Sequence, residues 1–184
     1  MPLRDILRAK PRILFVGINP GLRSEALGHH FAGPGNPFWR LLHASKLTPR
    51  LLSFEEDAAM ADFGLALTNF CSRATRAAAD LTPRDFDEGR KSLLRKIGRI
   101  KPKTVAFVGV TLYRRCFKAA AAPGPGAKPE TIAGARVFVL PNPSGLNRGF
   151  PRFSDKLLWF SRLSRFAQNQ KTRRPKWTGG PKGA

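Results

Sequence analysis

The chain has 184 residues, a length that suits one domain with a real core and is short for two. Its 33 lysines and arginines stand against 12 acidic residues, and the net charge of +21 indicates a polyanionic partner, nucleic acid rather than a membrane surface. No apolar run is long enough to cross a bilayer, and two cysteines exclude a four-cysteine zinc or iron–sulfur site.

The first part of the chain combines a charged terminus, a buried strand and a long loop. The first ten residues lack the apolar stretch of a secretory signal, so we expect a cytoplasmic, nucleoid-associated protein. We also expect a short helix within these residues. An apolar run predicts a strand over 12–18 that is buried on both faces. The strand ends where Pro20 keeps Asn19 extended. The loop over 19–35 is rich in glycine, and compact domains rarely keep so long a loop without a use for it.

Helices and strands then alternate along the chain. Capping residues mark three helix starts: Asn36 ahead of Pro37, Ser53 with Glu56, and Thr82 ahead of Pro83. The remaining predicted elements are helices over 36–42 and 53–63, a strand over 65–70, a helix from 82, a strand over 104–108, a helix over 112–122, a proline–glycine linker over 123–126, a strand over 136–140 and a helix over 153–168.

This alternation predicts an α/β fold, a three-layer sandwich with a central, mostly parallel four-stranded sheet flanked by helices. Residues 1–168 are expected to form a single domain. Residues 169–184 carry five of the basic residues and no acid, and we expect them to form a disordered basic tail. The alternative interpretation of the positive charge is a basic surface that is exposed to solvent and binds no polyanion.

Two loops follow buried strands, and parallel strands place both at the sheet edge where ligands bind in open α/β folds. The first, over 17–21, holds the amide of Asn19 on a stiff turn. The second, over 142–148, carries Leu146 among glycine, asparagine and arginine. Such an apolar tip suits a wedge that fills the gap left by an extruded base. Taken alone, Asn19 also suits an ordinary turn, and Leu146 could fold back into the core.

These two loops, together with GHHFAGPGNPFW at 28–39, resemble the mismatch-specific uracil-DNA glycosylase and thymine-DNA glycosylase family of the uracil-DNA glycosylase superfamily. The three motifs arrive in order, and the resemblance covers about residues 10–168. It implies a DNA repair enzyme that flips uracil from U:G and other uracil-containing DNA and hydrolyses the N-glycosidic bond, leaving an abasic site. We expect a monofunctional enzyme that needs no metal or cofactor, works as a monomer on double-stranded DNA, and does not bind membranes; the sequence leaves open whether single-stranded DNA is a second substrate.

The resemblance also implies roles for the residues of the base pocket. Asn19 would orient the water that attacks the anomeric carbon, because an amide cannot act as a base. Phe31 would stack on the flipped uracil, with backbone groups around Ile18 and Phe31 reading the edge of the base. Ser24 would lie near C5 of the base. His30 would contact base or sugar, or would be a solvent-facing turn residue.

The second loop matches the DNA-intercalation loop of that family, with Ser144, Gly145, Leu146, Asn147 and Arg148 at the matched positions. Leu146 would be the plug, and Asn147 and Arg148 would contact the opposite strand.

Charge and position alone suggest a phosphate contact for Asn69 and for the loop that carries Arg73 and Arg76. Two other functions compete with the glycosylase. A non-catalytic DNA-damage-binding protein would use the same basic surface and wedge. A nucleotide-binding enzyme is disfavoured, because the loop over 17–21 is not G-x-G-x-x-G and no G-K-[ST] phosphate loop occurs.

Overall fold

The computed structural model describes residues 3–117, 124–145 and 147–169. Its five strands form one sheet in the order β2-β1-β3-β5-β4, in which only β4 runs antiparallel to its neighbour. The strands are β1 (Ile13–Gly17), β2 (Leu65–Asn69), β3 (Thr104–Val108), β4 (Gly126–Ile132) and β5 (Ala135–Leu140). The predicted α/β class and the mostly parallel sheet are therefore confirmed, with a fifth strand added at one edge.

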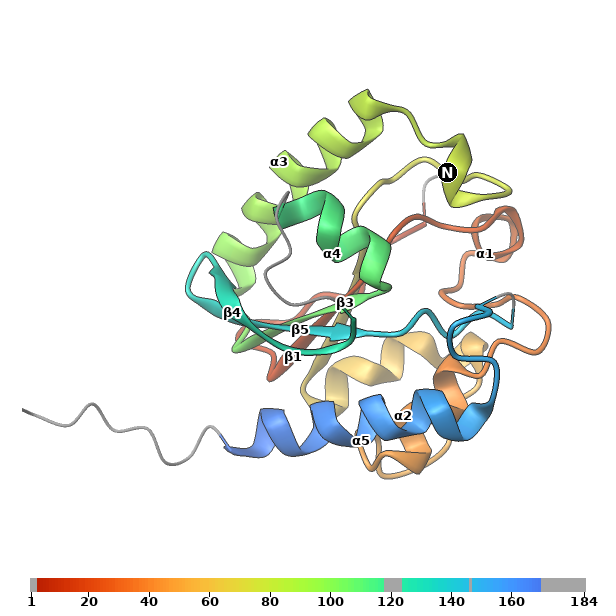
Figure 1. Ribbon diagram of the computed structural model, residues 1–184, viewed down its shortest axis with the longest axis vertical. Coiled ribbons are helices and arrows are strands. Elements are labelled where there is room, and N and C mark those ends of the chain that lie inside the picture. The colour runs from red at the N-terminus through yellow and green to blue at the C-terminus, as the bar shows by residue number, and fades with distance from the viewer. Residues whose placement is uncertain (1–2, 118–123, 146, 170–184) are drawn as a thin grey trace, which may run out of the picture.

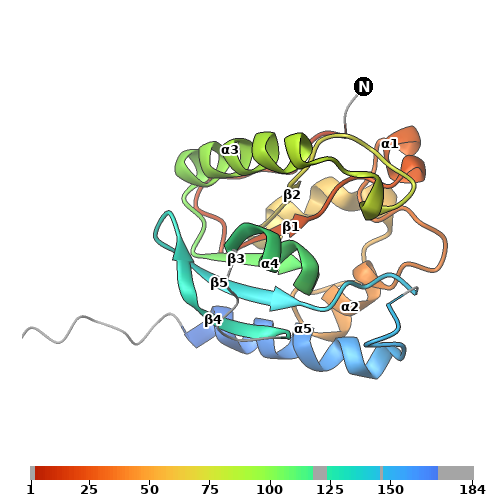
Figure 2. The same ribbon diagram turned by 45° about the horizontal axis from the view of Figure 1, so that its top comes forward.

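Helices cover both faces of the sheet (Figure 1). The helices on one face are α3 (Pro83–Ile100) and α4 (Val110–Phe117), and those on the other are α2 (Phe38–Ala44), the 3₁₀ segment η1 (Phe54–Phe63) and α5 (Phe153–Gln168). Figure 2 shows the three layers from a second direction. Two short helices, α1 (Leu22–Leu27) and η2 (Ala78–Asp80), lie in the loops that follow β1 and β2. Within the described ranges, no helix has the length and apolarity to span a membrane.

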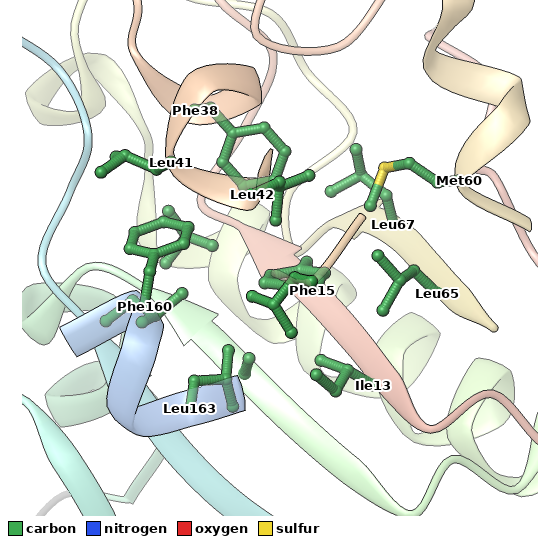
Figure 3. Packing of buried hydrophobic residues seen from close by; sticks show 14 of the residues in the cluster. Ile13, Phe15, Phe38, Leu41, Leu42, Met60, Leu65, Leu67, Phe160 and Leu163 are labelled. Carbon is green, nitrogen blue, oxygen red and sulfur yellow. The ribbon is translucent and has the colours of Figure 1, made fainter. Parts of the chain in front are cut away.

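Alternate side chains of each central strand enter two separate cores. Phe15 of β1 points into the core that contains Phe38 and Phe160 (Figure 3), whereas Leu14 points into the core beneath α3 and α4. Every residue of β1 is buried. Burial on both faces explains why this strand reads as an unbroken apolar run rather than as an alternating pattern.

Local capping fixes the start of α3 as the sequence predicts. The N–H of Asp85 donates to Thr82 Oγ1 at 3.3 Å, and the N–H of Thr82 donates to the Asp85 carboxylate at 2.7 Å. Pro83 occupies the first helical position, where no N–H is needed. At the start of η1, the Glu56 carboxylate likewise accepts the N–H of Ser53 at 3.1 Å.

Three predictions of secondary structure were wrong. The helix expected within 1–10 is absent from the described part of that segment. There, Ile6 pairs with Leu67 of β2 in an antiparallel bridge, with N–H to O=C distances of 2.9 and 2.8 Å. The glycine-rich loop over 19–35 contains helix α1, and Gly126, expected as the last residue of the linker, begins strand β4, which the sequence did not predict.

Smaller differences concern boundaries. Helix α2 begins at Phe38, whose N–H donates to Asn36 Oδ1 at 3.1 Å, and α4 begins at Val110 instead of 112. The rest of the helix predicted over 112–122 lies outside the described residues, as does the tail beyond Asn169.

Candidate active site

The four parallel strands end at the same edge of the sheet, and the loops that follow them gather there. In Figure 1, α1 and the loop that follows β5 both lie at this edge. Gly17, at the end of β1, is in register with Asn69 at the end of β2. The loops after these two strands are joined by backbone hydrogen bonds from Cys71 to Ile18 (2.8 Å) and from Thr75 to Pro20 (3.2 Å).

The amide of Asn19 is held in one orientation at this edge. Its Nδ2 donates to the carbonyl oxygens of Pro20 (3.0 Å) and Arg73 (3.1 Å) and to Thr75 Oγ1 (2.8 Å). Carbonyl oxygens only accept, so the nitrogen must face them. Thr75 Oγ1 donates its own proton to the Ala77 carbonyl at 2.7 Å, and it can therefore only accept from Asn19.

This arrangement leaves the acceptor end of the Asn19 amide available. Within the described part of the chain, Oδ1 takes part in no hydrogen bond, and the residue is half-buried. Asn19 lies between a cavity of about 200 Å³ beside α1 and a more open one of about 660 Å³ that faces the loop after β5. Oδ1 is thus a preoriented acceptor for a polar hydrogen, such as that of a water molecule.

Phe31 forms one wall of the smaller cavity. Its ring stacks on Phe38 with the ring centroids 3.8 Å apart and the planes 19° from parallel. Phe38 is fully buried in the core, so it gives Phe31 a rigid support on one face. The ring edge lies 3.8 Å from the position that a Cβ on Gly17 would occupy. An aromatic wall of this kind suits the stacking of a flat base.

Ser24 and His30 also line the smaller cavity, but both side chains are already engaged. Ser24 Oγ accepts the N–H of Ala32 at 3.2 Å, which ties α1 to the segment that carries Phe31. His30 is 2% exposed, so the alternative of a solvent-facing turn residue is wrong. Its Nε2 lies 2.9 Å from the carbonyl oxygen of Arg4. Burial lowers the pKa of His30, and the neutral ring donates from Nε2 and can only accept at Nδ1.

Asn69 is a candidate residue of the base pocket, although the sequence suggested a phosphate contact for it. Its side chain lies over Gly17, where an added Cβ would sit 2.6 Å from Asn69 Oδ1. It lines the same cavity as Ile18 and Phe31, with no side-chain hydrogen bond among the described residues. This position suits reading a base edge better than it suits a phosphate contact. The signal in the sequence was an asparagine at the end of a buried strand, parallel to the one that precedes Asn19.

The loop after β5 is stabilised from within. Asn147 Nδ2 donates to the Asn142 carbonyl at 2.9 Å, and its Oδ1 accepts the N–H of Gly149 at 3.2 Å. Lys156, a buried residue of α5, donates to the Ser144 carbonyl at 3.2 Å. Gly145 and Arg148 are exposed beside these contacts, and Leu146 lies outside the described residues.

Of the two arginines assigned to phosphate, one is committed elsewhere. Arg73 makes a bidentate pair with Asp85, at 2.7 Å for the shortest contact, and donates to the Asp80 carbonyl. That pair lowers the pKa of Asp85 and anchors the Asn19-holding loop to the start of α3. Arg76 is exposed and lines the larger cavity near Asn19, where it suits a contact with an anion. The described residues contain no cluster of three or more metal-ligating side chains.

A profile described as "Uracil DNA glycosylase superfamily" matches residues 5–163. A solution NMR structure from Methanosarcina acetivorans, described as a "putative Uracil DNA glycosylase", superposes with a TM-score of 0.59 over 91% of this chain and 97% of that chain. The two sequences are 17% identical, so this likeness concerns the fold.

Proposed function

The chain belongs to the uracil-DNA glycosylase superfamily, and we propose that it is a monofunctional uracil-DNA glycosylase of the mismatch-specific and thymine-DNA glycosylase branch. It flips uracil from the duplex, hydrolyses the N-glycosidic bond and leaves an abasic site. The single observation that carries the proposal is the fixed amide of Asn19 at the wall of the pocket: its nitrogen is held by three acceptors, and its oxygen makes no hydrogen bond among the described residues.

The chemistry follows from what an amide can and cannot do. The bond between C1′ and N1 of uracil breaks, and its electron pair leaves with the base. Water then adds its oxygen to C1′ and releases a proton to solvent. Asn19 cannot remove that proton, so its contribution is to orient the water through Oδ1. Stabilisation of the departing uracil anion supplies the other contribution.

The smaller cavity provides groups for that second task. Phe31 offers a stacking surface, and the Asn69 amide offers a donor and an acceptor to the polar edge of uracil. Backbone groups around Ile18 and Phe31 lie at the same wall. Ser24, which lines the same cavity, is the residue assigned to the C5 side of the base, and neutral His30, whose Nε2 donates to the Arg4 carbonyl, has only the acceptor Nδ1 left to offer.

Opening of the duplex falls to the loop after β5. Leu146 is assigned the role of the plug, and Gly145 and Arg148 of the same loop are exposed. Asn147 keeps the loop in shape through its two amide contacts, and Ser144 is anchored by the Lys156 ammonium. Extrusion of a base costs a few kcal/mol and costs less at a mismatch.

The test is release of base from labelled oligonucleotides that carry U:G, U:A, single-stranded U or T:G, with EDTA present. Alkali added afterwards reveals abasic sites, and a sample without alkali shows whether the strand is cut by the protein. We expect release from U:G that is insensitive to EDTA and no cleavage before alkali. Tight binding without release from any of the four would instead assign the protein to the non-catalytic DNA-damage binders.

A further inference from the structure

The segment that carries Phe31 has an anchor outside the loops of the active site. Asp57 belongs to η1, in the helix layer that also contains α2 and α5, and its side chain is 9% exposed. Its Oδ2 accepts the N–H of His30 at 2.9 Å, and its Oδ1 lies 3.3 Å from His29 Nδ1. One buried carboxylate therefore holds the two residues that directly precede the stacking ring.

The backbone at Phe31 needs such support. Its φ of +52° lies in the left-handed region, which a residue with a large side chain rarely adopts. Conformations of this kind persist where the surrounding structure fixes them. On the far side of Phe31, Ser24 Oγ accepts the N–H of Ala32 and Arg23 Nε donates to the carbonyl of Ala32 at 2.9 Å. Asp57 supplies the fixation on the near side.

We propose that Asp57 is a positioning residue for base recognition: through the His30 N–H and the His29 imidazole, its carboxylate sets the Phe31 ring on which the flipped base stacks. The inference rests on the proposed function of the Phe31 pocket. Asp57 itself does not touch the base, because it lies behind the His29–His30 segment and does not line the cavity.

The roles of the two contacts can be separated by substitution. Asp57→Ala removes both acceptors and leaves the His30 N–H without its partner. Asp57→Asn keeps one oxygen for that N–H, so it should restore most of the function. His29→Ala removes only the imidazole contact and should have a smaller effect than Asp57→Ala. Asp62→Ala, an exposed acid of the same element, is the matched control.

Single-turnover release of uracil is the first readout. We expect Asp57→Ala to slow release by about 10- to 100-fold, the scale that follows displacement of a binding group by about 1 Å. Affinity for duplex DNA with a tetrahydrofuran abasic analogue should stay within about twofold, because that ligand leaves the Phe31 pocket empty. An equal loss of affinity for the abasic duplex would overturn the proposal, since it would indicate general damage to the fold.

A double-mutant cycle tests whether Asp57 acts through Phe31. In the Phe31→Ala background, Asp57→Ala should cause little further loss, whereas additive losses would show that Asp57 acts independently of the ring and would overturn the proposal.

Amide hydrogen exchange of wild-type protein and Asp57→Ala gives a readout that does not need activity. We expect exchange in residues 28–32 to accelerate while that in α3 is unchanged, and unchanged exchange in 28–32 would contradict the anchoring role. If the wild type releases no base at all, the proposed function fails, and accelerated exchange would still support the anchor.

Discussion

At the scale of single residues, the amide of Asn19 carries the most specific expectation. Because its nitrogen is held by Pro20, Arg73 and Thr75, its oxygen has one direction in which to accept a hydrogen bond. Asn19→Ala should lower the single-turnover rate of uracil release by about 10²- to 10⁴-fold, the range for one well-placed catalytic group. Binding to uracil-containing duplex should survive, since the pocket and the basic surface are unchanged.

A rate within twofold of wild type would remove Asn19 from the mechanism. The matched comparison is Thr75→Val, which keeps the shape of the side chain but deletes the hydroxyl that accepts from Asn19 Nδ2. A loss smaller than that of Asn19→Ala is expected there, because the two carbonyl acceptors still hold the amide.

His30 makes stability depend on pH. Burial lowers its pKa, against the opposing influence of the Arg4 carbonyl and of Asp57 and Asp5, while Lys96 acts in the same direction as burial. The unfolded chain therefore binds a proton at a higher pH than the native protein does. The contribution of neutral His30 to the free energy of unfolding is fully present above the ordinary histidine pKa of about 6.5. It declines as the pH falls below that value toward the lowered native pKa.

Thermal unfolding at pH 7.5 and 5.5 measures this effect. His30→Gln keeps a donor for the Arg4 carbonyl but cannot titrate, so its loss of Tm between the two pH values should be smaller than that of wild type. An equal loss in both proteins would show that other groups control the acid limb of stability.

The sequence predicts Asn19 and Phe31 as site residues because each stands in a short local motif. The position of Asn69 in the pocket was not accessible in that way. Its side chain enters the pocket because Gly17, 52 positions earlier in the chain, leaves the space that a Cβ would fill. That contact depends on the pairing of β1 with β2, and no local pattern encodes it.

At the scale of elements, helix α3 contains two glycines with opposite expected behaviour. A Cβ on Gly89 would lie 2.5 Å from the carbonyl oxygen of Phe70, whereas Gly98 is exposed and a Cβ there would meet nothing within 4 Å. Gly98→Ala should raise the free energy of unfolding by about 0.5–1 kcal/mol, through helix propensity and reduced entropy of the unfolded chain. Gly89→Ala should lower it by about 1–3 kcal/mol, because packing is already tight.

Urea unfolding of the two variants at one pH measures both effects. The prediction for Gly89→Ala depends on the close approach of α3 to Phe70. A Gly89→Ala variant that is more stable than wild type would contradict that close approach. Gly89→Ala should also slow uracil release, because Phe70 and Cys71 lead into the loop that binds Asn19.

Elements with strong local signals were predicted well, and those formed by tertiary pairing were not. The apolar runs of β1 and β3 and the cap at Thr82 each identified an element. Strand β4 has a register shift between Ala127 and Thr131, around a proline that only an edge strand or bulge tolerates, so it lacks an alternating pattern. The N-terminal segment has a helix-like spacing of apolar residues, yet Ile6 pairs with β2.

At the scale of the whole molecule, positive charge should control the affinity for DNA and have little influence on the rate of the chemical step. The folded layers place the groups proposed for catalysis at one edge of the sheet, whereas the 33 basic residues are spread along the chain. Lysines and arginines bound to phosphates release counterions, so affinity for DNA should fall steeply with salt. The rate of the chemical step on bound DNA should change little over the same range, because the roles proposed for Asn19 and Phe31 concern the flipped nucleotide alone.

The C-terminal residues allow this separation to be measured. Residues 170–184 hold Lys171, Arg173, Arg174, Lys176 and Lys182, and truncation after Asn169 lowers the net charge from +21 to +16. If all five contact phosphate, the slope of log K against log salt should become shallower by up to about 4.5, at about 0.9 for each contact. The single-turnover rate at saturating enzyme should stay within about twofold, because the truncation removes none of the residues assigned to the pocket. An unchanged slope would show that the tail makes no phosphate contacts, and a collapsed rate with intact binding would place part of the tail at the active site.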